Sequence, residues 1–153
     1  MNKTLIVRAI TDALRQVFEN LCKSSKQTRS AGNDAETKAE GKYDTRSTEE
    51  NYLADGLARL AQEAAQAVEA YESFPIRAFD SEEPVDVGAL VLVKFPDASE
   101  WFFLGPAGGG TEVLCDGKTI TVLTPESPLG QQLIGLRAGD TTGAPRASVE
   151  KIS

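Results

Sequence analysis

The spacing of apolar residues changes once along this chain, and that change limits the folds available to it. In two stretches, Ile6 to Leu21 and Leu53 to Tyr71, apolar residues recur every three or four positions, which is the period of one face of an α-helix. After Pro75 the period becomes two, as in strands that bury one face. The sequence therefore predicts a helical N-terminal part and a β-rich C-terminal part, joined by the stretch SFPIRAFDSEEPVD.

Two long amphipathic helices are predicted in the N-terminal part. The apolar face of the first consists of Ile6, Ile10, Ala13, Leu14, Val17 and Leu21, and that of the second of Leu53, Leu57, Leu60, Ala64, Ala67, Val68 and Tyr71. The residues between them, 23–42, are almost wholly polar. This pattern favours an antiparallel helical hairpin, a short coiled coil in which each helix buries its apolar face against the other. We expect Ser47 to be the N-cap of the second helix, in a capping box with Glu50.

The C-terminal part contains five segments typical of short strands, at residues 88–95, 100–105, 111–117, 118–124 and 146–153. Asp116-Gly117, between the third and fourth, suits a tight hairpin turn. SPLGQQLIG predicts a short helix with Ser127 as N-cap, Pro128 at its first position, and Gly135 or Gly139 at its end. The prediction is an α+β chain: a helical hairpin over 1–74, a linker over 75–84, and a small antiparallel β domain with one short helix over 85–153.

Trp101, Phe102 and Phe103 follow one another in a predicted strand. Successive side chains of a strand point to opposite faces, so the three cannot all enter the core. We therefore expect one face of this aromatic cluster to be exposed or to lie at an interface.

Composition excludes several kinds of site. Histidine is absent, which excludes His-dependent triads and His-ligated zinc, and two distant cysteines are too few for a disulfide scaffold. Metal chemistry would have to use carboxylates, which suit Mg²⁺ or Mn²⁺. No apolar run could span a membrane and no signal peptide opens the chain, so we expect a cytoplasmic protein. The net charge of −7 argues against general nucleic-acid binding, whereas the basic residues of 1–29 suggest a protein partner with nucleic acid nearby.

Residues 118–140, KTITVLTPESPLGQQLIGLRAGD, resemble the C-terminal signature of the bacterial Gre transcript-cleavage (transcription elongation) factor family. In that signature a strand leads through a Ser/Thr-Pro turn into a short P-x-G-x-x-L-I/L-G helix and a Gly-Asp turn. The matching residues are Thr124-Pro125, Pro128, Gly130, Leu133, Ile134, Gly135 and Gly139-Asp140. KYDTR and YLADGLAR, at 42–46 and 52–59, are similar to a subgroup of stand-alone Gre-related proteins. The family also has the same order of parts, with a helical hairpin before a small β-rich domain.

The resemblance implies an FKBP-like C-terminal domain that docks at the rim of the RNA polymerase secondary channel, and a hairpin that enters the channel. Carboxylates at the hairpin tip would help to hold a second Mg²⁺ in the polymerase active site, where it orients water for hydrolysis of backtracked RNA. The protein would then not be an enzyme but an accessory factor for the RNA cleavage that polymerase performs. Its partners would be RNA polymerase and, near the tip, nascent RNA. We expect a monomer without membrane association.

The expected tip is EGKYDTRSTEEN, residues 40–51. When Tyr52 is aligned with the tyrosine of the family's tip motif, the two acidic positions fall on Thr45 and Thr48. A shift of one residue brings in Asp44 and Glu49, and we predict this pair as the metal-binding and catalytic carboxylates. Glu40 and Glu50 are reserves, Glu50 being the better candidate for a helix cap.

Partner-binding residues are expected in two places. At the tip, Lys42 and Arg46 would face RNA or acidic groups of the polymerase, whereas a solvated charged face is the favoured interpretation of Lys23, Lys26 and Arg29. Tyr43 would either stack on a base or cover the junction of the helices. Pro125, Ser127 and Pro128 would belong to the docking surface that the resemblance implies.

Three functions remain open on this sequence. The first is stimulation of transcript cleavage through the tip carboxylates. The second is occupation of the polymerase channel without cleavage, which the imperfect tip motif favours. The third, a free-standing FKBP-like isomerase or chaperone, is motivated by the small β-rich domain alone.

Overall fold

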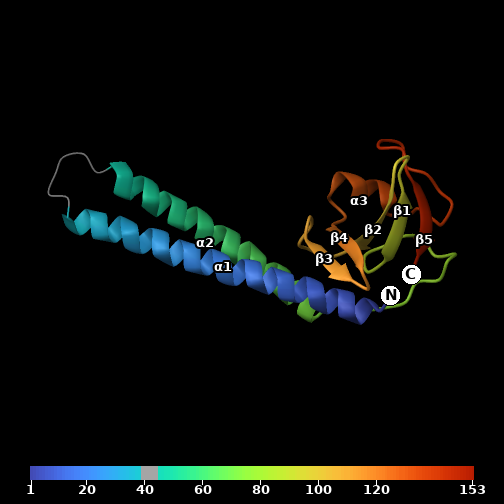
Figure 1. Cartoon of the computed structure of the whole chain (residues 1–153), viewed down its shortest axis with the longest axis horizontal. Coiled ribbons are helices and arrows are strands. Elements are labelled where there is room, and N and C mark those ends of the chain that lie inside the picture. Colours follow the sequence, from blue (N-terminus) through green and yellow to red (C-terminus); the bar gives the residue numbers. More distant parts are fainter. Residues whose placement is uncertain (39–44) are drawn as a thin grey trace. The chain divides into compact units, whose positions relative to one another are not determined.

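The computed structural model describes the backbone of residues 1–38 and 45–153, and the side chains other than those of 31–47 and Glu50. Two long helices precede a five-stranded sheet with one short helix (Figure 1). The elements are α1 (Lys3–Lys38), α2 (Thr45–Glu72), β1 (Leu90–Lys94), β2 (Ser99–Leu104), β3 (Glu112–Cys115), β4 (Lys118–Leu123), α3 (Pro128–Leu133) and β5 (Ser148–Ile152). The predicted fold class, an α-helical hairpin followed by a small β domain with one short helix, is confirmed.

The chain divides into two compact units. Met1–Ala13 and Glu69–Ser153 form the β unit, and Leu14–Val68 form the hairpin unit. The first turns of α1 and the last turn of α2 thus belong to the β unit. The domain bounds at residues 74 and 85 stay predictions.

In the hairpin unit, α1 and α2 run antiparallel and side by side (Figure 1). The Ser25 hydroxyl donates to the carbonyl oxygen of Ala54 over 3.0 Å, and one turn further along α1 the Arg29 guanidinium meets the Asp55 carboxylate at 2.6 Å. The Arg29–Asp55 pair is exposed and adds little stability, whereas the Ser25 bond is buried. Among the described residues, no helix is both long and apolar enough to cross a bilayer.

The face that α2 buries differs from the predicted one. Its buried residues are mainly alanines: Ala54, Ala61, Ala64 and Ala67. Leu53 and Leu60, which the prediction placed against α1, are 57% and 50% exposed. The prediction was therefore wrong in the N-terminal half of this face, because small alanine side chains let the two helices approach closely while the leucines lie outside.

The helix ends also differ from the predictions. Helix α1 continues through the polar stretch to Lys38, and Val17, predicted as apolar contact, is exposed. Helix α2 begins at Thr45, so Ser47 lies in its first turn and does not precede it as an N-cap. The side chain of Ser47 lies outside the described residues.

The five strands of the β unit pair in the order β3-β4-β2-β1-β5. Three of the pairings are antiparallel, as predicted, while β2 and β4 run parallel from Trp101–Ile120 to Leu104–Leu123. The β3–β4 hairpin turns at Asp116 and Gly117, whose φ angles of 51° and 73° are those of the predicted tight turn.

Both faces of this sheet are covered. One face forms a core with α3 through Val91, Val93, Phe102, Leu104, Leu133 and Val149. On the other face Phe103 is fully buried, and Phe74 meets it edge to face with ring centroids 6.2 Å apart. Tyr71, in the last turn of α2, donates its hydroxyl to the carbonyl oxygen of Ala107 over 2.8 Å. Burial raises the pKa of Tyr71 above its ordinary value.

Candidate functional site

The turn between β4 and α3 is built around the hydroxyl of Ser127. This hydroxyl accepts the N–H of Gly130 over 3.1 Å and donates to the carbonyl oxygen of Thr124 over 2.7 Å. Ser127 has extended backbone angles, and Pro128 follows at the start of the helix. The predicted N-cap and helix start are confirmed.

Gly130 has a steric role in the same turn. A Cβ atom at this position would collide with the carbonyl oxygen of Thr124 and lie 2.6 Å from the hydroxyl of Ser127. Any larger residue would therefore push α3 away from the turn that caps it. The glycine of the signature-like stretch is required by this close approach.

The end of α3 is tied to the segment that enters the sheet. Gly135 has a φ of 85°, and its N–H donates to the carbonyl oxygen of Val85 over 2.8 Å. The N–H of Val85 in turn donates to the carbonyl oxygen of Leu136 over 2.8 Å. Gly139 has a φ of 94° and precedes Asp140, whose carboxylate accepts the N–H of Arg137 over 2.8 Å. Residues 124–140 thus form one closely hydrogen-bonded turn–helix–turn.

The three residues predicted for docking differ in how far they are exposed to solvent. Pro128 is exposed, whereas Pro125 and Ser127 are half-buried. Both hydrogen-bonding functions of the Ser127 hydroxyl are used inside the turn. Of the three, the ring of Pro128 is therefore the most accessible, on a turn that the Ser127 hydroxyl holds together.

Most of the predicted tip residues lie outside the described part of the chain. Glu40, Lys42, Tyr43 and Asp44 belong to the segment that is not described, as do the side chains of Arg46 and Glu50. Their roles as metal-binding, RNA-facing or partner-binding residues stay predictions.

Glu49 is the one member of the predicted carboxylate pair whose side chain is described, and it is exposed on α2. It follows the first turn of the helix, which contains no acidic residue. Its carboxylate is chemically suited to Mg²⁺. Among the described side chains, no three acidic or thiol groups gather into a metal site.

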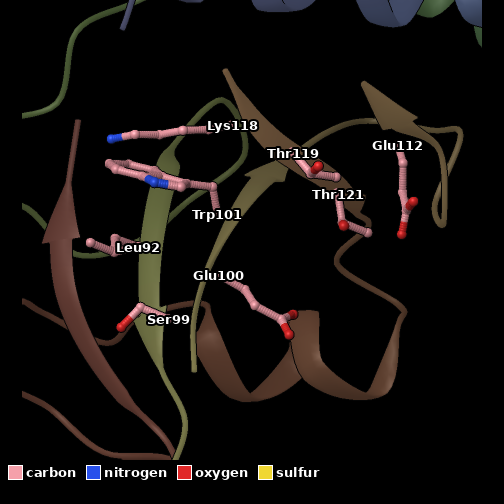
Figure 2. A pocket seen from close by; sticks show the side chains of 8 residues that line it. All are labelled: Leu92, Ser99, Glu100, Trp101, Glu112, Lys118, Thr119 and Thr121. Carbon is pink, nitrogen blue, oxygen red and sulfur yellow. The ribbon is translucent and has the colours of Figure 1, made fainter. Parts of the chain in front are cut away.

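A groove of about 600 Å³ opens in the β unit where β2 and β4 begin (Figure 2). The β2–β4 ladder starts only at Trp101–Ile120, so the residues before it on each strand are not paired with each other. On one side, the Lys118 ammonium lies over the Trp101 ring, 5.1 Å from its centre, with Leu92 nearby. The other side carries two carboxylates and two hydroxyls, those of Glu100, Glu112, Thr119 and Thr121.

The groove contains none of the predicted site residues. Phe102 and Phe103 are buried while Trp101 is half-buried, which confirms that one member of the aromatic cluster leaves the core. Glu100 and Glu112 gave no signal in the sequence, because they come together only through the parallel pairing of β2 with β4.

A second polar cluster joins α1 to the segment after α2 within the β unit. The Lys3 ammonium donates to the carbonyl oxygens of Arg77 and Gly88 over 2.6 and 3.0 Å. The ring of Phe79 packs against both cations, 4.5 Å from the Lys3 nitrogen and 3.6 Å from the guanidinium carbon of Arg77. Burial, with the nearby positive charge of Arg77, lowers the pKa of Lys3 to about 8 despite the opposing charge of Glu83.

Comparisons with known proteins complete this description. No protein-family model and no curated protein matches the chain. A structure of the transcription factor Gfh1 aligns over 94% of this chain and 93% of its own, with 18% identity and a TM-score of 0.36. Gfh1 of Thermus thermophilus, a GreA factor homolog, aligns over 95% of each chain with 15% identity and a TM-score of 0.35. Gfh1 of Thermus aquaticus aligns over 88% of this chain and 92% of its own, with 18% identity and a TM-score of 0.35.

Proposed function

We propose that this protein is a Gre-related factor that binds RNA polymerase through its secondary channel and promotes cleavage of backtracked transcripts. The observation that carries the proposal is the turn–helix–turn at 124–140. The Gre-like residues there hold a defined structure around Ser127 and Gly130. The same chain carries a hairpin of two long helices whose connecting residues include Asp44.

The two units have separate tasks in this proposal. The β unit docks at the channel rim through the exposed ring of Pro128 and its neighbours Pro125 and Ser127. The hairpin unit carries Asp44 and Glu49 into the channel.

At the tip, Asp44 and Glu49 would provide carboxylate oxygens to a Mg²⁺ ion shared with the polymerase active site. When bound, that ion supplies the activation of a water molecule for hydrolysis of the RNA. Lys42 and Arg46 would face the nascent RNA, and Tyr43 would stack on one of its bases. The protein would act as a monomer and would perform no reaction without polymerase.

The test uses a stalled, backtracked elongation complex with Mg²⁺ and the full-length protein. We expect faster shortening of the RNA than in polymerase alone. The double variant Asp44→Asn/Glu49→Gln should bind polymerase as the unchanged protein does and lose most of the stimulation, because it lacks only the carboxylate charges.

Binding is measured separately, by co-sedimentation of the protein with core polymerase. A protein that does not bind polymerase refutes the whole proposal. If the protein binds polymerase and its double variant retains full stimulation, only the proposed roles of Asp44 and Glu49 are refuted.

A second candidate is a regulator that occupies the channel without cleavage. It is favoured by the two threonines at the family's acidic positions, since Thr45 and Thr48 both lie in the first turn of α2 and neither binds a metal as a carboxylate does. This candidate predicts that the protein displaces a cleavage-competent factor from polymerase while the RNA stays uncut. Faster RNA cleavage by polymerase in its complex with this protein than by polymerase alone would exclude it.

A further inference from the structure

Helix α2 has a second apolar face that the hairpin does not use. Leu53 and Leu60 are exposed by half or more, and Leu57 between them is only half-buried. The face turned to α1 consists instead of alanines such as Ala54 and Ala61. Close packing against α1 accounts for the buried alanines, but it leaves the larger apolar surface of the leucines in contact with water, where a second molecule could still bury it.

The exposed leucines surround a hole of the kind found in coiled-coil packing. Leu53, Gly56, Leu57 and Leu60 are spaced at i, i+3, i+4 and i+7, the four positions that surround one inserted side chain in knobs-into-holes packing. Together with Arg59 and Glu63 they line a shallow groove of about 380 Å³. We call Leu53, Gly56, Leu57 and Leu60 the leucine hole.

Gly56 is an independent indication that another molecule packs into this hole. A glycine inside a helix lowers helix stability, and here no heavy atom other than those of its chain neighbours and the adjoining helix backbone lies within 4 Å of the position that a Cβ would occupy. The hairpin therefore does not require glycine at this position. A small residue at the floor of the hole does allow the backbone or a bulky side chain of a second helix to come close.

The charges around the leucine hole indicate what kind of helix fits. Exposed glutamates lie beyond both of its ends, Glu49 one turn before Leu53 and Glu63 one turn after Leu60. They are separated by about 21 Å along the helix axis. Among the side chains that the structure describes, Arg59 is the single basic one that lines the groove. We propose that the leucine hole is a docking site for an amphipathic helix of another protein, which inserts one large apolar side chain over Gly56 and carries basic residues toward Glu49 and Glu63.

Helix α2 of a second copy, packed face to face, fits the site less well. Helix α2 carries six acidic side chains and two arginines, so two copies packed face to face would bring like charges together. A basic helix would instead find complementary charges at both ends of the hole. The proposal does not rest on the function proposed above.

The test uses the full-length, ¹⁵N-labelled protein and two synthetic amphipathic helical peptides of about 20 residues, or about five turns. Both carry a central leucine, and they differ only in having lysines or glutamates toward their ends. We expect the lysine peptide to shift the amide resonances of residues 53–63 and to bind at least about tenfold more tightly than the glutamate peptide. Glu63→Lys should reduce that preference.

The decisive variant is Gly56→Met, which fills the hole while replacing glycine with a better helix former. Binding of the lysine peptide should fall by at least about tenfold while the thermal midpoint of the protein stays the same or rises. The matched control is Ala58→Met, which adds the same side chain at an exposed position outside the groove and should leave binding unchanged.

Three results would overturn the proposal. These are equal binding of the two peptides, binding that Gly56→Met does not weaken, and the absence of resonance shifts at millimolar peptide. Sedimentation of the protein alone provides a further check, because self-association that Gly56→Met abolishes would make a second copy the occupant.

Discussion

Two neighbouring oxygen atoms leave no room for a side chain at Gly130. Replacing it with alanine would press a Cβ atom against the carbonyl oxygen of Thr124 and the hydroxyl of Ser127. We expect Gly130→Ala to lower the free energy of unfolding by about 1–3 kcal/mol, as overpacking does elsewhere. Urea unfolding followed by circular dichroism measures the change.

Gly143→Ala is the control for that variant. No atom lies within 4 Å of the Cβ position at Gly143, and its φ is not positive. The free energy of unfolding should therefore change by less than about 0.5 kcal/mol. Equal losses in the two variants would show that the cap around Ser127 is not what makes Gly130 necessary.

Lys3 makes stability depend on pH in the alkaline range. Its pKa is lowered to about 8 in the folded protein, while an unfolded chain titrates near its ordinary value of about 10.4. Between these values the unfolded chain binds more protons than the folded one, so the free energy of unfolding should rise with pH. Urea unfolding at several pH values from about 7.5 to about 10 measures this rise.

Tyr71 limits the rise at the upper end. Its raised pKa means that above about pH 10 the unfolded chain loses a proton that the folded protein keeps, so stability should fall there. Lys3→Gln should flatten the rise, whereas Tyr71→Phe should keep the rise and weaken the later fall. If the free energy of unfolding still rises with pH in Lys3→Gln, another titratable group causes the rise.

Single residues were predictable where their role is local. Ser127, Asp116-Gly117 and Gly135 were identified because caps and tight turns depend on neighbours along the chain. Gly105 was not, since its requirement comes from Tyr71, whose hydroxyl occupies the space that a Cβ at Gly105 would take. Such contacts between distant residues leave no local pattern.

At the scale of elements, the packing of α1 against α2 depends on small side chains. Ala54 is 0% exposed and its carbonyl oxygen accepts the Ser25 hydroxyl, so Ala54→Leu should force the helices apart and cost about 1–3 kcal/mol of unfolding free energy. Leu60→Ala, on the half-exposed outer face, should cost less than about 1 kcal/mol. Helical circular dichroism during urea unfolding distinguishes the two. The opposite order would mean that the leucines, and not the alanines, close the hairpin.

All five strands and the short helix were predicted in the right places, because alternation and turn residues mark them clearly. The helices were predicted as elements, but the buried face of α2 was not. Apolar residues occur on two of its faces, and the sequence does not say which of them meets α1. The choice depends on how closely the two backbones approach, which favours Ala54 and Ala61 over Leu53 and Leu60.

At the scale of the whole molecule, the two units should differ in local stability. The β unit contains large buried residues such as Phe103, Leu104 and Leu133, whereas α2 contributes mainly alanines to the hairpin unit. We expect amides of β1 and β2 to exchange with solvent at least about tenfold more slowly than those of α2 between Leu53 and Ala61. Hydrogen exchange with mass spectrometry measures this. Equal protection would indicate that the two units open together.

The order of the parts and the fold class follow from the change of hydrophobic period, which is a property of long segments and so is robust to local errors. The parallel pairing of β2 with β4 does not follow from it, because strand order depends on contacts across the sheet. The candidate tip was predicted only through resemblance, and Asp44, one of its two predicted metal-binding carboxylates, lies outside the described part of the chain.

The groove beside β2 provides its own optical signal. Trp101 is the only tryptophan in the chain, so its indole emission reports on one site alone. The Lys118 ammonium places a positive charge over the face of this chromophore. Steady-state fluorescence of the unlabelled protein can therefore be used to screen for compounds that enter this groove, with Lys118→Met as the variant that reveals the contribution of the charge.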